Sequence, residues 1–323
     1  MPLMDFNMNM DFNMDFNMGT AGSSVGGNGT RVRFNTEDYR KYVAAGAALI
    51  PATHAAMRFP AYWDPELRAC EYLNGFLLWF FDWRARLQAA VAGGVLPNLT
   101  LTPPHTLGGP ALTNQIIDLL DRAPDRPDRF NEIRSQHSGD GAIGYFLGML
   151  MIDPGRMPAT HLLIRVARRI GEHVAMCLKG EFRCPRPSQL CSAIVPMIDP
   201  PATPSFPSGH SLQAALIARC LENTAPPMQP ANLLNDLGVR IGENRIIAGL
   251  HFDHDHVSGR AIGRWIYDQL LGPLLPPPPP PPVPHPLNAI YAGPPPPPPF
   301  QVQFRSLMAA ATGEMANQWA PAP

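Results

Sequence analysis

The sequence predicts an all-α fold, a helical bundle with disordered or extended N- and C-terminal tails. Hydrophobic residues make up 45% of the 323 residues and charged residues only 16%, which is enough apolar material for one large core. Between the tails, apolar residues recur every three to four positions, the period of a helix face. No run of alternating residues marks a strand, and the prolines gather in loops and tails.

Residues 1–30 are a low-complexity N-terminus that we expect to be disordered. Met-Asp-Phe-Asn occurs at Met4–Asn7, Met10–Asn13 and Met14–Asn17, and a Gly/Ser stretch follows. Such a segment has too little apolar surface to offset its ordering entropy. A short adhesive or partner-binding tag is the alternative interpretation.

Residues 31–273 form the predicted helical catalytic domain. Its first helix, Thr36–Met57, has a Thr N-cap and acidic residues in its first turn. Its second, Pro65–Ala92, opens with proline and ends before Gly93 and Gly94. The best supported is Thr160–Lys179, with apolar residues at a steady spacing of three to four. The other predicted helices are Ala111–Leu120, Gly141–Ile152, Gly209–Glu222, Ala231–Leu250 and His254–Leu271.

Residues 274–323 form a polyproline-rich C-terminal arm. Two proline runs, Pro276–Pro282 and Pro294–Pro299, enforce polyproline II geometry and offer no hydrogen-bond donors. We expect a stiff spacer or an arm lying on the body; a ligand for an aromatic, polyproline-binding partner is the alternative. Phe300–Trp319 is compatible with a docked terminal helix.

Composition excludes several classes of protein. The net charge of −1 gives no nucleic-acid footprint. We expect no secretory signal, because the N-terminus lacks a cationic start followed by a continuous apolar run. The best apolar windows, Gly75–Phe81 and Ala142–Ile152, fall short of the roughly 20 residues that a spanning helix needs. The five cysteines, an odd number without zinc spacing, favour free thiols in a reducing compartment. We therefore expect a soluble, cytoplasmic protein that does not span a membrane, with a homo-oligomer left open.

Three short fragments carry the chemistry. Lys179 is followed after six residues by Arg186-Pro187. Pro207-Ser208-Gly209-His210 comes next, and Arg245 is followed by His251 and then Asp255. Each fragment alone is common, but together they supply cations, a hydroxyl, a flexible backbone amide and two imidazoles. This is the set of groups that a tetrahedral or trigonal-bipyramidal oxyanion needs around it.

The predicted helices suggest how these groups cooperate. Ser208 is a plausible N-cap, so the first-turn amides of the following helix would face an anion, and Gly209 would let the backbone approach it closely. His251 stands four residues before Asp255, which can orient one ring nitrogen while the other faces the anion. His251 is thus a candidate nucleophile or direct ligand, and His210 a candidate proton donor and acceptor.

Other histidines are weaker candidates. His251, His254 and His256 with nearby aspartates look like a metal cluster, but alternate positions of a helical turn point to different sides. His161 and His173 lie on one long predicted helix without acidic partners, so packing or solvent contact is the simpler role. His137 could line the mouth of the pocket.

The three fragments resemble the signature of the superfamily that joins type 2 phosphatidate phosphatases, bacterial non-specific acid phosphatases and vanadium-dependent haloperoxidases. That signature is a lysine, six residues and Arg-Pro; then Pro-Ser-Gly-His; then Ser-Arg, five residues, His, three residues and Asp. The chain matches it except that Asn244 replaces the serine. The resemblance covers Thr160–Leu271, the signature region 160–271, and implies the family's helical bundle.

The resemblance also implies a role for each residue. Five of them would bind the equatorial oxygens of the phosphate or vanadate: Lys179, Arg186, Ser208, Gly209 and Arg245. His251 would attack phosphorus, or bond to vanadium as the metal ligand if vanadate is bound. His210 would act as the acid and base, and Asp255 would steady His251.

The resemblance leaves two reactions open. A soluble phosphatase acting on a small-molecule phosphoester, with no cofactor, is favoured by the short gaps of 22 residues from Arg186 to Ser208 and 35 from His210 to Arg245. Two further features favour the phosphatase. Oxidisable Met176 and Cys177 stand ahead of Lys179 where a tryptophan is missing, and Thr203 stands where haloperoxidases often carry an aromatic residue or a histidine. A haloperoxidase using vanadate, halide and peroxide is favoured by the long helical region before Lys179 and by the missing export signal. A non-catalytic scaffold acting through the polyproline arm is the third hypothesis.

Overall fold

The computed structural model describes residues 64–96, 109–137, 141–225, 232–275 and 300–319, which apart from Asp64 belong to one compact unit, Pro65–Pro323. Within these ranges all regular structure is helical and no strand is present, which confirms the all-α prediction. The N-terminal repeats, the predicted helix Thr36–Met57 and both proline runs lie outside the described residues.

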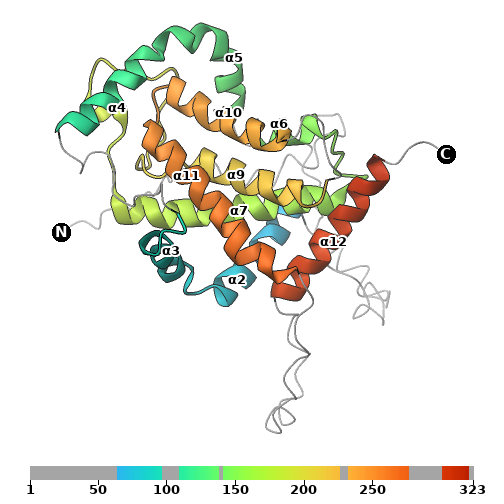
Figure 1. The fold of residues 1–323 in the computed structure, drawn as a ribbon. Helices are drawn as coiled ribbons and strands as arrows, with labels where there is room; N and C mark the ends of the chain where they lie inside the picture. Colours follow the sequence, from blue (N-terminus) through green and yellow to red (C-terminus); the bar gives the residue numbers. More distant parts are fainter. Residues whose placement is uncertain (1–63, 97–108, 138–140, 226–231, 276–299, 320–323) are drawn as a thin grey trace, which may run out of the picture. The chain divides into compact units, whose positions relative to one another are not determined.

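Helices of at least nine residues make up most of this unit (Figure 1). In chain order they are α2 (Pro65–Trp79), α3 (Trp83–Ala92), α4 (Gly109–Asp121), α5 (Arg126–His137), α6 (Gly141–Met149), α7 (Pro158–Phe182), α9 (Gly209–Glu222), α10 (Leu233–Ile247), α11 (Asp253–Trp265) and α12 (Phe300–Gln318). Short elements join them: 3₁₀ turns at Ala123–Asp125 and Gly272–Leu274, the single turn α8 (Pro187–Leu190) and a π-helical segment at Ile266–Leu271.

Helix α9 is the centre of the unit. It packs against α7, α10 and α11, which lie around it (Figure 1). Leu212, Leu216 and Leu221 of α9 are fully buried, so both ends of this helix are anchored in the core. The Ser-Gly-His fragment lies at the start of α9, so the packing of this helix in the core fixes the position of the candidate site.

Glycines let α11 approach α9 closely. A Cβ atom on Gly259 would lie 2.5 Å from the backbone oxygen of Ser208, and one on Gly263 would lie 2.3 Å from that of Leu212. Only glycine allows this backbone contact. It brings the first turn of α11 against the start of α9, where the Ser208 N–H donates to the carbonyl of Asp255 at 3.0 Å.

The C-terminal helix α12 docks on α7 and α2, as Phe300–Trp319 suggested. Phe300 and Phe304 stack on each other, and Phe300 meets the edges of Phe76 and Phe80 of the α2 region. Within the predicted arm 274–323, residues 300–318 therefore contribute to the main core.

Several predicted helices differ in extent from the observed ones; His254–Leu271, for example, begins one residue earlier as α11 and continues past Trp265 as the π-helical segment. The single helix Pro65–Ala92 is wrong, because a turn at residues 80–82 divides it into α2 and α3. The buried positions 76, 80, 83 and 87 keep helical spacing across the turn, so the pattern conceals it. Helix α6 ends at Met149 rather than Ile152, with Met151 in the left-handed region at φ 50°. Helix α10 is a few residues shorter at each end than Ala231–Leu250.

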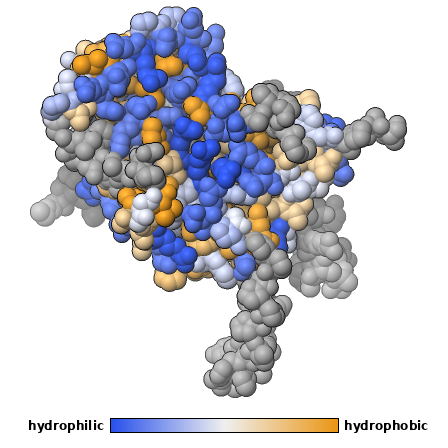
Figure 2. Space-filling view, in the orientation of Figure 1, coloured by the Kyte–Doolittle hydropathy of each residue, from blue (hydrophilic) through white to orange (hydrophobic). Residues whose placement is uncertain are grey.

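Helix α5 was not predicted. Its sequence is mostly polar, and only Ile133 and Gln136 are buried, so no apolar stripe announces it. Figure 2 shows that the face of the unit over α5 is mostly hydrophilic. The buried side of α5 packs on α10 and, as described below, reaches the candidate site.

No helix within the described ranges combines the length and the apolar character needed to cross a bilayer. All five cysteines lie within these ranges and none forms a disulfide there.

Candidate active site

The three sequence fragments meet at the start of α9. Lys179 comes from the last turn of α7, Arg186 directly precedes α8, and Arg245 lies in the last turn of α10. These three cations are at most 4% exposed, as is His251. Charged groups buried to this extent need partners or a ligand.

The imidazole of His251 is held from one side. Its Nδ1 lies 3.3 Å from Oδ2 of Asp255, and its Nε2 lies 3.5 Å from Nη1 of Arg186. The same Asp255 oxygen accepts the Phe252 N–H at 3.0 Å, which fixes the carboxylate in the first turn of α11. Asp255 therefore holds one side of the ring, and Nε2 faces the guanidinium of Arg186.

Ser205 completes this arrangement and was missed in the sequence. Its Oγ donates to Oδ2 of Asp255 at 2.5 Å and lies 3.3 Å from Nδ1 of His251. It is fully buried. A serine three residues ahead of the Ser-Gly-His fragment carries no pattern of its own, so only the fold reveals it.

Burial sets the charge of this pair. Desolvation lowers the pKa of His251 by more than hydrogen bonding to Asp255 raises it. For Asp255, burial raises the pKa, but hydrogen bonds from His251 and Ser205 outweigh it and the net pKa is lowered. The pair is a neutral imidazole beside a carboxylate, so the Nε2 lone pair is available as a nucleophile or ligand.

Lys179 and Arg186 are both bonded to the loop ahead of α9. The ammonium of Lys179 donates to the carbonyls of Pro204 and, at 3.0 Å, of Ser205. Nε of Arg186 donates to the carbonyls of Pro201 at 3.1 Å and Thr203 at 2.9 Å. These two cations thus donate chiefly to backbone oxygens.

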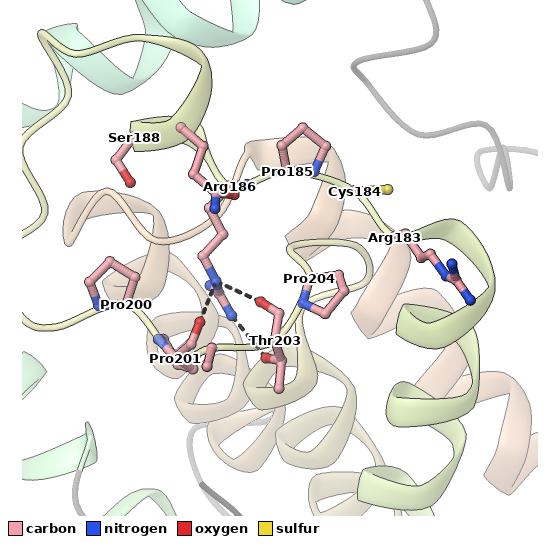
Figure 3. Close-up of a pocket in the computed structure, with 11 residues that line it drawn as sticks. Arg183, Cys184, Pro185, Arg186, Ser188, Pro200, Pro201, Thr203 and Pro204 are labelled. Carbon is pink, nitrogen blue, oxygen red and sulfur yellow. Dashed lines mark hydrogen bonds between the residues drawn. The ribbon is translucent and has the colours of Figure 1, made fainter. Parts of the chain in front are cut away.

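A pocket of about 520 Å³ opens beside Arg186 (Figure 3). The loop that accepts hydrogen bonds from Arg186 lines one side of the pocket with Pro200, Pro201 and Pro204. Cys184 lies in another part of the lining. Because Nη1 of Arg186 reaches His251, this side chain connects the pocket with the buried imidazole.

Arg245 is the least satisfied cation. It is fully buried, and its Nη2 donates to the carbonyl of Ile133 at 2.9 Å and to Oε1 of Gln136 at 3.4 Å. Its Nε and Nη1 have no hydrogen-bond partner in the described part of the chain. Burial lowers the pKa of Arg245 to about 10, so the guanidinium stays charged at neutral pH. Unpaired buried donors cost stability unless a ligand satisfies them.

His210 follows Gly209 in the first turn of α9. Burial lowers its pKa well below the usual value, and the charges of Arg245, His251 and His137 lower it further, so all three are near it. A hydrogen bond to the backbone of Gln136 acts in the opposite direction. His210 is therefore neutral.

Ser208 caps α9, as predicted, by accepting the Ser211 N–H at 3.4 Å. Packing against the rest of the protein does not require a glycine at position 209. A Cβ atom there would meet only Ala175, at an ordinary 3.9 Å, so a need for glycine at 209 would have to come from a ligand.

Gln136 was also missed. It is 1% exposed, and its Oε1 accepts from Nδ2 of Asn244 at 3.0 Å as well as from Arg245. Asn244, which replaces the serine of the family signature, thus helps to hold the amide that contacts Arg245. The neighbouring His137 has its pKa lowered by burial first and then by Arg245, which places it close to the cations.

The remaining candidates have structural partners. His173 contacts Cys177 at 3.4 Å on α7, His254 stacks on Phe206, and His256 bonds to Ser211. Among the described residues, no group of three or more His, Cys, Asp or Glu side chains is arranged to hold a metal ion.

No protein-family model matches the chain, and no curated protein matches it at a significant level.

Proposed function

We propose that this chain is a member of the phosphatidate phosphatase type 2 and haloperoxidase superfamily, and that it hydrolyses phosphomonoesters through a phosphohistidine at His251. The observation that carries the proposal is the neutral, buried imidazole whose Nδ1 is held by Asp255 and whose Nε2 faces Arg186. An imidazole in this state is an activated nucleophile next to an anion-binding cation.

Substrate binding would use the donors around this ring. Nε and Nη1 of Arg245 have no other partner in the described residues, and a phosphoryl group would satisfy them. Arg186, Lys179, Ser208 and the amide of Gly209 would supply further donors to the equatorial oxygens. Three buried cations would offset most of the charge of the transition state.

The first chemical step would form a bond between Nε2 of His251 and phosphorus as the ester P–O bond breaks. The leaving oxygen would take a proton from His210. His210 is neutral in the free protein, and the negative charge of the bound phosphoryl group would favour its protonated form. In the second step a water would attack phosphorus, its proton would pass to His210, and the N–P bond would break.

The test is hydrolysis of a generic aryl phosphate by the full-length protein. We expect turnover without added metal, trapping of 32P on His251, and loss of both in His251→Ala. His161→Ala, on the opposite part of α7, is the matched control and should keep its activity. Turnover that survives in His251→Ala would refute the proposal.

A vanadium-dependent haloperoxidase is the second candidate, because the same free donors and neutral Nε2 also fit vanadate. Lys179, Arg186, Ser208, Gly209 and Arg245 would hold its oxygens and His251 its metal; bound vanadate would activate peroxide for halide oxidation. The oxidisable residue at the pocket is Cys184 rather than Cys177, which contacts His173. A sulphur atom in the pocket lining is more compatible with a phosphatase. Bromination of a dye by protein loaded with orthovanadate, above a His251→Ala control, would favour the haloperoxidase.

The scaffold hypothesis depends on the two proline runs of the C-terminal arm, which lie outside the described residues. Deleting residues 276–299 and comparing the partners recovered with full-length and deleted protein would test it.

A further inference from the structure

The Ser208 hydroxyl has both of its acceptor positions filled. Its Oγ accepts the Ser211 backbone N–H at 3.4 Å and the Ser211 hydroxyl at 2.9 Å. A serine oxygen has two lone pairs, so only its own proton remains for another contact. Both serines are fully buried, so solvent does not compete for these bonds.

The direction of the Ser211 hydrogen bond also determines which ring nitrogen of His256 carries the proton. Because the Ser211 proton is directed at Ser208, its oxygen must accept from Nδ1 of His256, which lies 2.9 Å away. This assigns the proton of the imidazole to Nδ1. Burial lowers the pKa of His256 to about 4, so the ring is neutral and carries one such proton.

The helices leave room for these three side chains only because α10 has a glycine beside them. A Cβ atom on Gly242 would lie 2.1 Å from Nδ1 of His256 and 2.6 Å from Oγ of Ser211. The three side chains thus form a line of hydrogen bonds between the start of α9 and α11, beside Gly242 of α10.

We propose that His256 and Ser211 are positioning residues that turn the Ser208 hydroxyl into an obligate donor toward the bound oxyanion. This inference rests on the proposed phosphate site and extends it to two residues outside the family signature. The direction of these hydrogen bonds determines whether Ser208 can donate to the anion. With the proton on the other ring nitrogen, the chain would reverse, Ser208 would donate to Ser211, and its lone pairs would face the anion.

The test is calorimetric titration of the full-length protein with inorganic phosphate. Ser211→Ala and His256→Phe should each weaken the affinity by about tenfold, the typical value of one hydrogen bond to a charged group. Ser211→Thr keeps the hydroxyl and should restore most of the affinity. Ser258→Ala is the matched control, since it removes a buried hydroxyl of α11 that has no partner in the described residues. It should bind phosphate like the wild type.

A double-mutant cycle separates positioning from a general loss of packing. In a Ser208→Ala background, Ser211→Ala and His256→Phe should have no further effect on affinity, because their influence passes through Ser208. If they weaken binding equally in that background, the positioning role is overturned while the phosphate site stands. If the wild type neither binds phosphate nor hydrolyses an aryl phosphate, the proposed function itself fails.

Discussion

Lys179 is a buried lysine whose charge changes near neutral pH. Burial, with a further contribution from Arg186, lowers its pKa from 10.5 to about 7, although Asp255 and Cys184 act in the opposite direction. The charged form is needed for anion binding, so affinity should fall as pH rises through 7. The effect of Lys179 on folding stability has the opposite sign. Between about pH 7 and 10.5 the unfolded chain binds more protons than the folded one, so the contribution of Lys179 to stability increases as the pH rises over that range.

Sulfate is the appropriate probe, because its charge is constant over this range. We expect its affinity to fall by up to about tenfold per pH unit above 7. Lys179→Arg should remove this dependence, because a guanidinium stays protonated. An unchanged profile in Lys179→Arg would show that another group titrates.

Gln136 should contribute to both stability and binding. Gln136→Leu would leave Nδ2 of Asn244 without its acceptor and deprive Arg245 of one partner, at a cost of about 1–3 kcal/mol in the free energy of unfolding. Because Arg245 would lose its alignment, phosphate affinity measured by calorimetry should fall as well. If only stability changes, Gln136 supports packing and does not position Arg245.

At the scale of elements, the contact of α11 with α9 determines whether His251, Asp255 and Ser208 meet. Gly259→Ala would force the two backbones apart, because the new methyl group would lie 2.5 Å from the Ser208 oxygen. We expect a loss of about 1–3 kcal/mol in stability by chemical denaturation, together with loss of phosphate binding. Gly313→Ala, on an exposed position of α12 with open space around it, is the matched control and should be neutral or slightly stabilising.

The helices show what the sequence can and cannot reveal. Helix α9 was predicted with its observed bounds, because Ser208 is a strong N-cap and apolar residues follow it at helical spacing. Helix α5 was missed, because a helix with two buried residues has no apolar stripe. The turn at residues 80–82 was missed for the opposite reason, since the buried spacing continues through it.

The site shows the same division. The residues of the signature could be named as candidates from the sequence, because the family resemblance supplies their order and spacing. Ser205 and Gln136 could not, because each acts through hydrogen bonds to residues between about 50 and 110 positions away, and such pairings follow from tertiary packing. Asn244 was recognised only as a departure from the signature, and its bond to Gln136 came from the fold.

At the scale of the whole unit, α12 is joined to the helix that bears Lys179. Oε1 of Glu314 accepts the Ala159 N–H at 2.9 Å, and Oε2 accepts the N–H of Thr160 at 2.8 Å. A carboxylate at these first-turn amides also interacts favourably with the α7 dipole. Glu314→Gln should lower the free energy of unfolding by about 1–2 kcal/mol.

Thermal or urea unfolding at low and high salt would measure this effect. Glu222→Gln, which removes a half-exposed ion pair with Arg219, is the control and should cost less than about 1 kcal/mol. A larger loss for Glu222→Gln than for Glu314→Gln would contradict the capping role.

The bonds from Lys179 and Arg186 to the loop at Pro201–Ser205 have a kinetic consequence. If the site binds an oxyanion as proposed, the anion would compete with these carbonyl oxygens for the donors. Binding would then proceed in two steps, encounter at the pocket followed by separation of the loop from the two cations. In stopped-flow mixing, the observed binding rate would then level off at high anion concentration. The plateau would equal the rate at which the loop separates from Lys179 and Arg186.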